Sequence, residues 1–536
     1  MKEDVFADLR VALKKNDVHS VTENIRILSL NKQVAHLNEL TRAKMWLASK
    51  AILDHDFTLA QEMYKPFDSA LPLQQMLVLP NLNEANLEKI VPLCPDWSEL
   101  ILLLAYCYWR KGDFRETKRV LIKLVAEFQD NRLGHTVCEL YCDSLCRMGG
   151  LANFSEIEHI CQSLAQPEQQ YRYPFVYLGA AKFFQRHQHQ PLNKRKLFNW
   201  RLFSKKQNNL LFYQAINLFN EAAKRPQGLI HVSCGCLSVI NPETIQLEQN
   251  ELKIEQTVFD LSNDYNTIDT AQAIVFFACD SVYLREYALL LVASVARLNK
   301  NKVTVCHVHI VDPDYDSFAI VEEIRRLVPQ VRLNLSSEKV NSTQKKPYYA
   351  SARFIRAIEL LDLYHVPLFV VDTDMVIEIS IDDLVRITQG NDVGLIVRTG
   401  SASFPWTEVQ AGTSYFSDSK NSRRFLELTK RAILTKLYEA ENAAQIWYVD
   451  QNALFSVYWL MKNELTICNL LSPPQKLIYS CYSRTVNRQQ FTNMKLAEYG
   501  VQPLELKNIT SNTSSEVSLT EAHKVPTFAE CCNQMV

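Results

Sequence analysis

The segment from Leu368 to Met375 reads Leu-Phe-Val-Val-Asp-Thr-Asp-Met, and the fold prediction starts from it. Its first four residues are an unbroken apolar run, which is typical of a buried parallel strand. Asp372 and Asp374 then follow at the carboxyl end of that strand. Because side chains alternate along a strand, both carboxylates are expected on the same face.

Two carboxylates on one face repel each other unless a cation or a proton lies between them. The divalent ions Mn²⁺ and Mg²⁺ prefer oxygen ligands and often share their coordination with substrate phosphates. Asp372 and Asp374 are therefore candidate metal ligands. The alternative interpretation is that both are solvent-exposed acids in a turn after the strand, where aspartate is common.

Strands that alternate with helices surround this segment. The hydrophobic pattern predicts strands over 274–279, 303–311 and 331–335, and helices over 283–298, 318–327 and 347–363. Such alternation predicts a parallel sheet with helices on both faces, and ligands of open sheets bind beyond the carboxyl ends of the strands. Asp280 and Asp312 end two of these strands, so we expect them at the same edge as the aspartate pair.

Composition bounds the class of protein. A chain of 536 residues predicts two or three domains, and 58 basic against 59 acidic residues give no field that favours nucleic acid. The 14 cysteines include no Cys-x-x-Cys pair, which argues against a zinc ribbon. The start lacks a signal-peptide pattern and no apolar run reaches the ~18 residues of a membrane span, so a cytoplasmic location is expected. No glycine-rich phosphate loop is present, so a bound phosphate would need a metal or basic side chains.

The first part of the chain, residues 1–226, has the periodicity of helices almost throughout. The stretch from Ser98 to Gln129 resembles a tetratricopeptide repeat, with Tyr108, Gly112 and Phe114 at or near the repeat's offsets. Stacked helix pairs of this kind form a solenoid whose concave face binds a partner. The alternative is a plain helical domain with no binding role.

The expected fold class is thus α + α/β, with a helical, tetratricopeptide-like domain followed by a Rossmann-like parallel or mixed sheet. The expected limits are a helical domain over 1–226, a β connector over 227–268, the sheet domain over 269–507 and a polar tail over 508–536. Within the helical part, residues 194–206 carry six positive charges and three aromatic residues. This segment would suit peripheral contact with an anionic membrane, and the alternative is a solvated basic insertion.

From about Ala273 to Tyr458 the chain resembles a nucleotide-diphospho-sugar transferase of the GT-A fold, and it is most similar to the retaining glycosyltransferases of family eight. Four blocks in order carry this resemblance: Phe277–Tyr283, Tyr349–Phe354, Val371–Asp374 and Trp447–Leu454. A further turn, Val409–Gly412, has Gln410 in place of the family's asparagine.

The resemblance implies roles for particular residues. Asp280 and Tyr283 would hold the nucleoside, and Arg353 would reach toward the nucleotide sugar, although a surface helix arginine is its alternative. Asp374 would be the principal metal ligand, and Asp372 would share the ion and a ribose hydroxyl.

The Asp-Gln pair Asp450 and Gln451 would lie at the transferred sugar, with the acting residue and any covalent step left open. The donor implied is a nucleoside diphosphate sugar, with UDP the commonest in this family, and the acceptor is a glycan, a lipid or a protein.

One departure concerns the third metal ligand. The family's C-terminal histidine motif is absent, and His523, followed by Lys524, is the only histidine after Asp374. We expect His523 as the third ligand and Lys524 at the diphosphate, with an unattached tail as the alternative. His307 and His309, which share a strand face, are expected to be structural.

Together these features predict a glycosyltransferase that uses Mn²⁺ or Mg²⁺ and whose helical domain recruits the acceptor. The rival hypothesis is a non-catalytic scaffold fused to a transferase domain that no longer turns over. The missing motif and Gln410 favour the rival, whereas the intact Asp-Thr-Asp and Asp-Gln favour the enzyme.

Overall fold

The computed structural model describes residues 2–15, 17–29, 37–53, 59, 63, 82–93, 97–126, 132–188, 198–225, 238–245, 258–260, 271–298, 304–340, 344–398, 402–440, 446, 448–471, 478–480 and 488–504. The chain forms two compact units. The first comprises residues 1–181 with 224–232, and the second comprises 182–223 with 233–536. Within the described residues, no helix is both long and apolar enough to span a bilayer.

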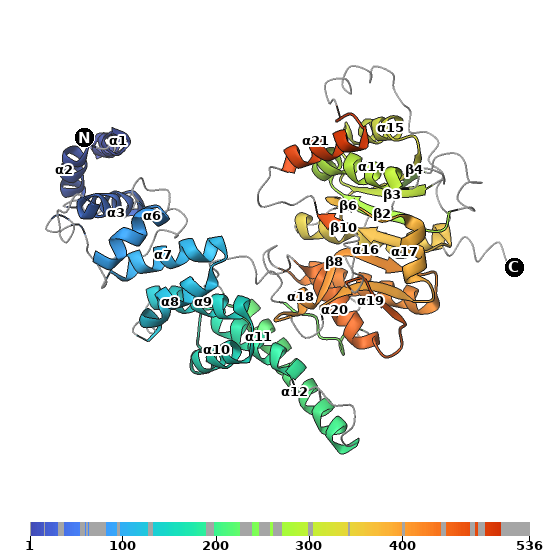
Figure 1. Cartoon of the computed structure of the whole chain (residues 1–536), viewed down its shortest axis with the longest axis horizontal. Helices are drawn as coiled ribbons and strands as arrows, with labels where there is room; N and C mark the ends of the chain where they lie inside the picture. The colour runs from blue at the N-terminus through green and yellow to red at the C-terminus, as the bar shows by residue number, and fades with distance from the viewer. Residues whose placement is uncertain are drawn as a thin grey trace. The chain divides into compact units, whose positions relative to one another are not determined.

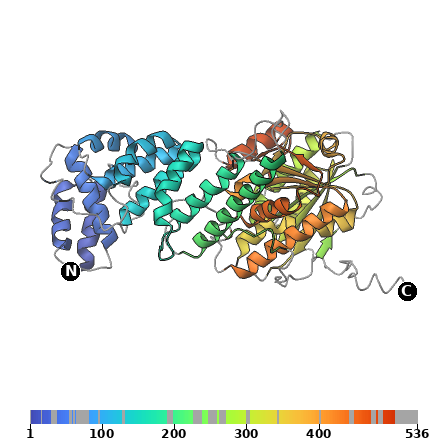
Figure 2. The ribbon, with the colours of Figure 1, turned by 90° about the horizontal axis from the view of Figure 1, so that it is seen from below.

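The first unit is built from helices that pack in succession along the chain (Figures 1 and 2). The helical expectation is confirmed for the residues described. The helices are α1 (Lys2–Lys15), α2 (Val18–Ser29), α3 (Leu37–Leu53), α6 (Glu84–Ile90), the 3₁₀ turn η2 (Val91–Leu93), α7 (Ser98–Lys111), α8 (Phe114–Val125), α9 (Arg132–Met148), α10 (Leu151–Leu164) and the first part of α11 (Tyr173–Gln188).

The turn between α7 and α8 joins these two helices into a pair. Gly112 ends α7 with a φ of 84°, a left-handed conformation that glycine adopts without strain. Asp113 then caps α8 by accepting a hydrogen bond from the backbone N–H of Glu116 at 3.1 Å. A helix hairpin results, as the repeat resemblance requires, and the tetratricopeptide assignment itself stays a prediction.

The second unit holds the predicted strands, which correspond to β2, β3, β4 and β5, and further strands that the sequence pattern did not predict. They are β1 (Val258–Asp260), β2 (Ile274–Cys279), β3 (Thr304–Val311), β4 (Val331–Glu338), β5 (Leu368–Val371), β6 (Met375–Ile377), β7 (Val393–Val397), β8 (Val409–Phe416), β9 (Ile467–Asn469) and β10 (Ile478–Ser480). Its helices are α12 (Phe198–Ala223), α13 (Ser281–Tyr283), the π-helical turn η5 (Leu284–Ala288), α14 (Leu289–Leu298), α15 (Ser317–Leu327), α16 (Lys345–Tyr364), α17 (Ile381–Thr388), α18 (Pro405–Glu408), α19 (Lys420–Glu439), α20 (Val449–Met461) and α21 (Arg488–Tyr499).

Eight of these strands form one mixed sheet in the order β1-β4-β3-β2-β5-β8-β7-β9. β4, β3, β2 and β5 are parallel, and β8 runs antiparallel to both β5 and β7. β1, from the expected connector, adds to β4 in antiparallel register. The described residues 238–245 of that connector are coil and turn, and the rest of it outside β1 lies beyond the described residues.

Helices cover both faces of the sheet, as the alternating pattern predicts (Figure 1). On one face, Val275 and Phe277 of β2 pack into a fully buried cluster with α14, α15 and α17. On the other face, α16 contacts β2, β3 and β5 and also packs against α19 and α20. The parallel strands are therefore buried on both sides, which explains the continuous apolar runs of β2 and β5.

Residues 182–223 pack with the sheet unit, although the expected division groups them with the helical domain. Phe212 of α12 stacks on Trp459 of α20, with ring centroids 4.3 Å apart. The buried guanidinium of Arg186 forms an ion pair with Glu408, which precedes β8. Both contacts bury side chains that a boundary at residue 226 would separate. Within the basic segment, residues 194–197 are outside the described residues, and 198–206 form the start of α12.

Candidate functional site

The carboxyl ends of three parallel strands place acidic residues along one edge of the sheet. Asp280 follows β2, Asp312 follows β3 and Asp372 follows β5. These strands are neighbours in the sheet or one strand apart, so the expectation that the acids share an edge is confirmed. The edge is the position at which open sheets of this kind bind ligands.

Arg353, on α16, joins two acids of this edge. Its Nη1 lies 2.6 Å from Oδ1 of Asp372, and its Nη2 lies 3.0 Å from Oδ2 of Asp450. The side chain is 4% exposed, so the interpretation of Arg353 as a surface arginine is wrong. Its Nη1 also donates to the carbonyl of Ala350 and its Nη2 to that of Ala411. The guanidinium is thus fixed, and two of its partners are carboxylates.

Asp450 lies in the first turn of α20 and is nearly inaccessible to solvent. Its Oδ1 accepts the backbone N–H of Gln451 at 2.8 Å. Burial raises the pKa of Asp450 to about 6, and the charge of Asp372 acts in the same direction. Arg353 opposes both effects. Asp450 is therefore an acid whose protonation changes near neutral pH, a property that functional carboxylates often have.

The Asp-Thr-Asp triplet forms a turn after β5. Thr373 is buried and its Oγ1 donates to the carbonyl of Ala278 in β2 at 3.1 Å, whereas Asp372 and Asp374 are half-buried. The two aspartates therefore differ in burial from the threonine between them, although the triplet is a turn and not the continued strand that the alternation argument assumes. The turn is held by the backbone N–H of Asp372, which donates to Gly412 of β8 at 3.0 Å.

Gly412 leaves space beside Asp372 that any other residue would fill. A Cβ at this position would lie 2.7 Å from Cε of Met375 and 3.4 Å from Oδ2 of Asp372. The absence of a side chain keeps that carboxylate oxygen approachable. The residues therefore fit a divalent ion in the chemistry of their donors, since Asp372 and Asp374 offer hard oxygen ligands at the edge where a phosphate would lie.

The described residues supply no group of three acidic, histidine or cysteine side chains that would hold a metal alone. His523 and Lys524 lie outside the described residues, so the expected third ligand and the diphosphate lysine stay predictions. An ion at Asp372 and Asp374 would take its remaining ligands from substrate, water or a residue beyond this part of the chain.

At the neighbouring strand end, Asp312 adopts a φ of 51° and is tied to α16. Its Oδ2 accepts hydrogen bonds from Lys345 and from the hydroxyl of Tyr349, each at 2.9 Å, and its Oδ1 accepts the N–H of Val340. Burial opposes ionisation, but these donors lower the pKa of Asp312. Asp312 thus anchors the start of the helix that carries Arg353.

A buried carboxylate fixes the same helix from the side of β4. Glu338 forms ion pairs with Arg356 and accepts the hydroxyl of Tyr348 at 2.9 Å, and Nε2 of His309 lies 3.0 Å from it. Burial would raise the pKa of Glu338, but His309 and Arg356 outweigh it and lower the pKa to about 2. Its backbone carbonyl also accepts the N–H of Asp312.

The two strand histidines belong to this buried network. His307 contacts the hydroxyl of Tyr364 and that of Ser336, each at 2.7 Å, and His309 contacts Ser336 at 2.8 Å. Burial lowers the pKa of His307 well below its usual value, so it is neutral. The prediction that these histidines are structural is confirmed.

Two further predicted residues, Asp280 and Tyr283, lie at α13, the short helix that follows β2. Asp280 caps it by accepting the N–H of Tyr283 at 2.8 Å, and the Tyr283 ring is 40% exposed. Gln451 follows Asp450 on α20 and is half-buried.

Sequence reasoning missed Glu338 and Arg356. Arg356 lies on the apolar face of the predicted helix, and a charged residue at such a position indicates a buried partner of opposite charge.

The known proteins that are similar to this chain are found among solved structures. Neither protein-family models nor curated proteins match the sequence. Among solved structures, the galactosyltransferase LgtC, in complex with donor and acceptor sugar analogs, is 14% identical and covers 44% of this chain and 98% of its own, with a TM-score of 0.29.

The bifunctional glycosyltransferase WbbM is 10% identical over 62% of this chain and 60% of its own, with a TM-score of 0.28. Mouse xyloside xylosyltransferase 1 is 13% identical over 37% of this chain and 84% of its own, with a TM-score of 0.26. All three proteins are sugar transferases by name. TM-scores this low establish neither fold nor activity for this chain.

Proposed function

We propose that this chain is a metal-dependent glycosyltransferase that moves a sugar from a nucleoside diphosphate sugar to an acceptor hydroxyl with retention. The donor class that the family resemblance implies is the UDP-sugars. The observation that carries the proposal is the buried guanidinium of Arg353 held between Asp372 and Asp450. It unites three of the four blocks on which the family resemblance rests, although those blocks lie far apart in the sequence.

Asp372 and Asp374 would hold Mn²⁺ or Mg²⁺, which when bound would act as a Lewis acid toward the diphosphate leaving group. His523 would complete the protein ligands and Lys524 would bind the diphosphate as a point charge. Asp280 and Tyr283, at the short helix α13 that follows β2, would hold the nucleoside. These assignments follow the resemblance.

In the transfer itself, the bond between the sugar C1 and the diphosphate oxygen breaks, and the acceptor oxygen bonds to C1. The acceptor proton leaves with the diphosphate. Positive charge develops on the sugar ring as the bond breaks, and Asp450 and Gln451 would lie beside it. An ionised Asp450 stabilises that charge, and it is buried, where a charge acts more strongly than in water.

Arg353 holds Asp450 in place and opposes its protonation, so it keeps the carboxylate ionised at neutral pH. Its second contact, to Asp372, links the sugar end of the site to the metal end. A nearby diphosphate would compete for the guanidinium, and Arg353 would then add a positive charge to the donor site. The first unit would recruit a glycan, lipid or protein acceptor.

One observation favours a second candidate, a non-catalytic scaffold. Asp372, which the transferase needs as a metal ligand, already has one oxygen in an ion pair with Arg353 at 2.6 Å. An arginine can neutralise a carboxylate in place of a metal, and such a domain would be stable without turning over. Nucleotide affinity distinguishes the two candidates.

The test is calorimetric titration of UDP into the full chain with and without Mn²⁺. The transferase proposal predicts that Mn²⁺ strengthens UDP binding by at least about tenfold, and that Asp374→Ala removes this gain while the chain stays folded. Asp382→Ala, which removes an acid at the start of α17, is the matched control and should keep the gain. Equal UDP affinity with and without Mn²⁺ in the unaltered chain would favour the scaffold.

A further inference from the structure

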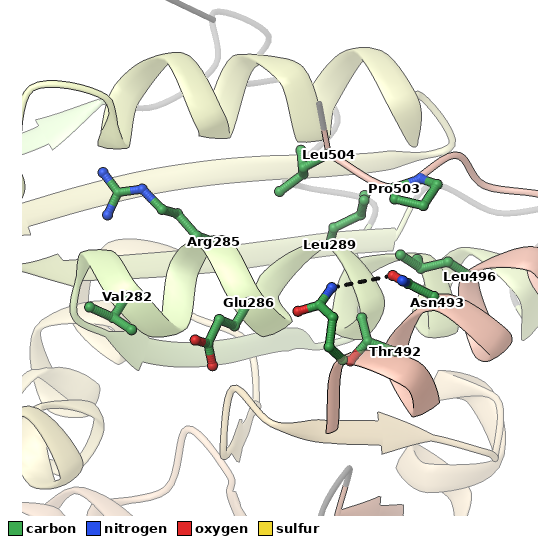
Figure 3. Close-up of a pocket in the computed structure, with 10 residues that line it drawn as sticks. Val282, Arg285, Glu286, Leu289, Thr492, Asn493, Leu496, Pro503 and Leu504 are labelled. Atoms are coloured by element: carbon green, nitrogen blue, oxygen red, sulfur yellow. Dashed lines mark hydrogen bonds between the residues drawn. The ribbon is translucent and has the colours of Figure 1, made fainter. Parts of the chain in front are cut away.

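A small pocket lies between α21 and the helical segment that follows β2, which comprises α13, η5 and α14 (Figure 3). Its volume is about 280 Å³, and α13, η5, α14, α21 and the segment after α21 supply its walls. This is near the lower end of the roughly 300–1,000 Å³ of ligand pockets, so it suits one small ring rather than a whole nucleotide. None of the residues assigned above to the transfer site lines it.

The chain builds this pocket by reversing after α21. Gly500 has a φ of 72°, and the N–H of Val501 returns to the carbonyl of Leu496 at 2.9 Å, which closes the helix end. Pro503 and Leu504 then complete the pocket wall. Opposite them, the π-helical turn widens the helix at Arg285 and Glu286, and such turns are frequent at functional sites.

The buried hydroxyl of Thr492 is the feature that points to a ligand. Thr492 lines the pocket and is 4% exposed, and its Oγ1 has no hydrogen-bond partner among the described residues. A buried polar group without a partner costs free energy, about 1–3 kcal/mol. Because Oγ1 is itself fully buried, a ligand hydroxyl or carbonyl would reach it after rotation of the Thr492 side chain about χ1, and that hydrogen bond would then remove the cost.

The other lining groups define the chemistry of the ligand. Gln489 and Asn493 line the pocket with side-chain amides, which are joined to each other by a hydrogen bond of 3.3 Å. Leu289 and Leu496 supply apolar wall. Amides both donate and accept hydrogen bonds, so they match a ligand whose hydroxyl groups do the same beside apolar C–H surface.

Charge excludes an anionic ligand. Arg285 is the only cation that lines the pocket among the described residues, and it forms an ion pair with Asp314 and lies 3.7 Å from Asp316. Its Nη1 also donates to the carbonyl of Ser281 at 3.1 Å. Glu286 adds an exposed negative charge. A phosphate or carboxylate would therefore meet no uncompensated positive charge.

We propose that this pocket binds one pyranose ring of a saccharide, as an accessory site beside the transfer site. The proposal rests on the proposed function for the choice of a glycan, since a sugar transferase meets glycan acceptors, and otherwise on the pocket alone. Arg285 links the pocket to the loop after β3, so a glycan held here would lie next to the strand edge that carries Asp280 and Asp312.

The experiment is saturation-transfer NMR and titration of the full chain with the methyl pyranosides of glucose, galactose, mannose and N-acetylglucosamine. At least one pyranoside should bind the unaltered chain. Thr492→Val keeps the shape and removes the hydroxyl, so it should weaken binding by about 3–10-fold, as should Asn493→Ala, whose exposed position spares the fold.

Thr429→Val is the matched control. Thr429 is also a buried helix threonine, but its hydroxyl is already satisfied by the carbonyl of Phe425 at 2.8 Å, and it lies outside the pocket. This variant should bind the pyranoside as the unaltered chain does. The proposal is overturned if no pyranoside of the panel binds, or if Thr492→Val and Asn493→Ala both leave the affinity unchanged.

The two proposals fail separately. Pyranoside binding by an unaltered chain that shows no Mn²⁺-dependent UDP binding would leave the pocket assigned and the transferase refuted. Mn²⁺-dependent UDP binding by a chain that binds no pyranoside would support the transferase and overturn the accessory sugar site. Competition by UDP for the pyranoside would place the ligand in the transfer site and overturn the accessory site.

Discussion

Nη2 of Arg353 lies 3.0 Å from Oδ2 of Asp450, and both side chains are almost fully buried. A buried charge without a partner is costly, and breaking such a pair typically destabilises a protein by about 3–5 kcal/mol. The same guanidinium contacts Asp372, so the pair fixes the position of one end of the site relative to the other. Replacement of Arg353 is therefore expected to change both the stability of the chain and the proposed activity.

The first prediction concerns this arginine. Arg353→Gln should lower the rate of UDP-sugar hydrolysis by about 10²–10³-fold, because it removes the positioned cation. Arg353→Lys should recover only a small part of the rate, since an ammonium cannot hold two carboxylates in the planar geometry of a guanidinium. Arg423→Gln, at a partly exposed ion pair with Asp362 and Asp418, is the control and should change the rate little. Full activity in a folded Arg353→Gln chain would contradict the role.

A second prediction follows from the raised pKa of Asp450. If the ionised carboxylate is the active form, the rate should rise with pH through about 6. Arg353 opposes protonation, so Arg353→Gln should move the midpoint of this rise to higher pH. The measurement is the pH dependence of residual hydrolysis in both chains. A midpoint that stays in place when the cation is lost would exclude Asp450 as the titrating group.

The third prediction concerns stability. The pKa of Glu338 is about 2 in the folded chain, below the unfolded value near 4.3, so its ionised form stabilises the fold above about pH 4 and this contribution is lost as pH falls toward 2. Glu338→Gln should lower the free energy of unfolding at pH 7 by about 3 kcal/mol.

Glu359→Gln is the matched control for Glu338→Gln. Glu359 contacts the same Arg356 at 2.7 Å but is partly exposed, so its loss should cost well under half as much. Chemical denaturation at pH 7 compares the two variants. Equal losses of unfolding free energy in the two variants would show that burial does not increase the contribution of Glu338 to stability.

Much of the sheet unit was predictable from sequence, because β2 and β5 are continuous apolar runs and because β2, β3 and β5 are each followed directly by an aspartate. Asp280, Asp312 and Asp372 were placed correctly on this basis alone. The antiparallel insertion of β8 between β5 and β7 was not predictable, since periodicity does not set strand order. The partners of Arg353 could not be found either, because Asp450 reaches it from another helix through tertiary packing.

The packing of α12 also escaped sequence reasoning. Helical periodicity continues through residues 166–226, so nothing in the pattern marks where one core ends and another begins. Phe212 and Phe183 are ordinary apolar helix positions in the sequence, yet they pack against Phe455 of α20. The choice of partner is decided by the shape of the core, which a one-dimensional pattern does not contain.

This packing gives the fourth prediction. A chain that begins near residue 263 lacks Arg186, Phe183 and Phe212, so Glu408 loses its buried partner and the apolar surface of α20 is exposed. Such a chain should aggregate or show no cooperative thermal unfolding. A chain that begins at residue 166, which retains all of α11, should stay soluble. Cooperative unfolding of the shorter chain would show that α12 is dispensable to the sheet core.

The central claim is sugar transfer chemistry at Arg353, Asp372 and Asp450, and its most direct test is turnover by the unaltered full chain. The measurement is release of UDP from a panel of UDP-sugars in the presence of Mn²⁺, by coupled assay. The account predicts UDP release from at least one donor, its loss on chelation, and a fall of at least about 100-fold in Asp374→Ala. Mn²⁺-dependent UDP binding in the unaltered chain without release from any donor, or release that Asp374→Ala leaves unchanged, would contradict it.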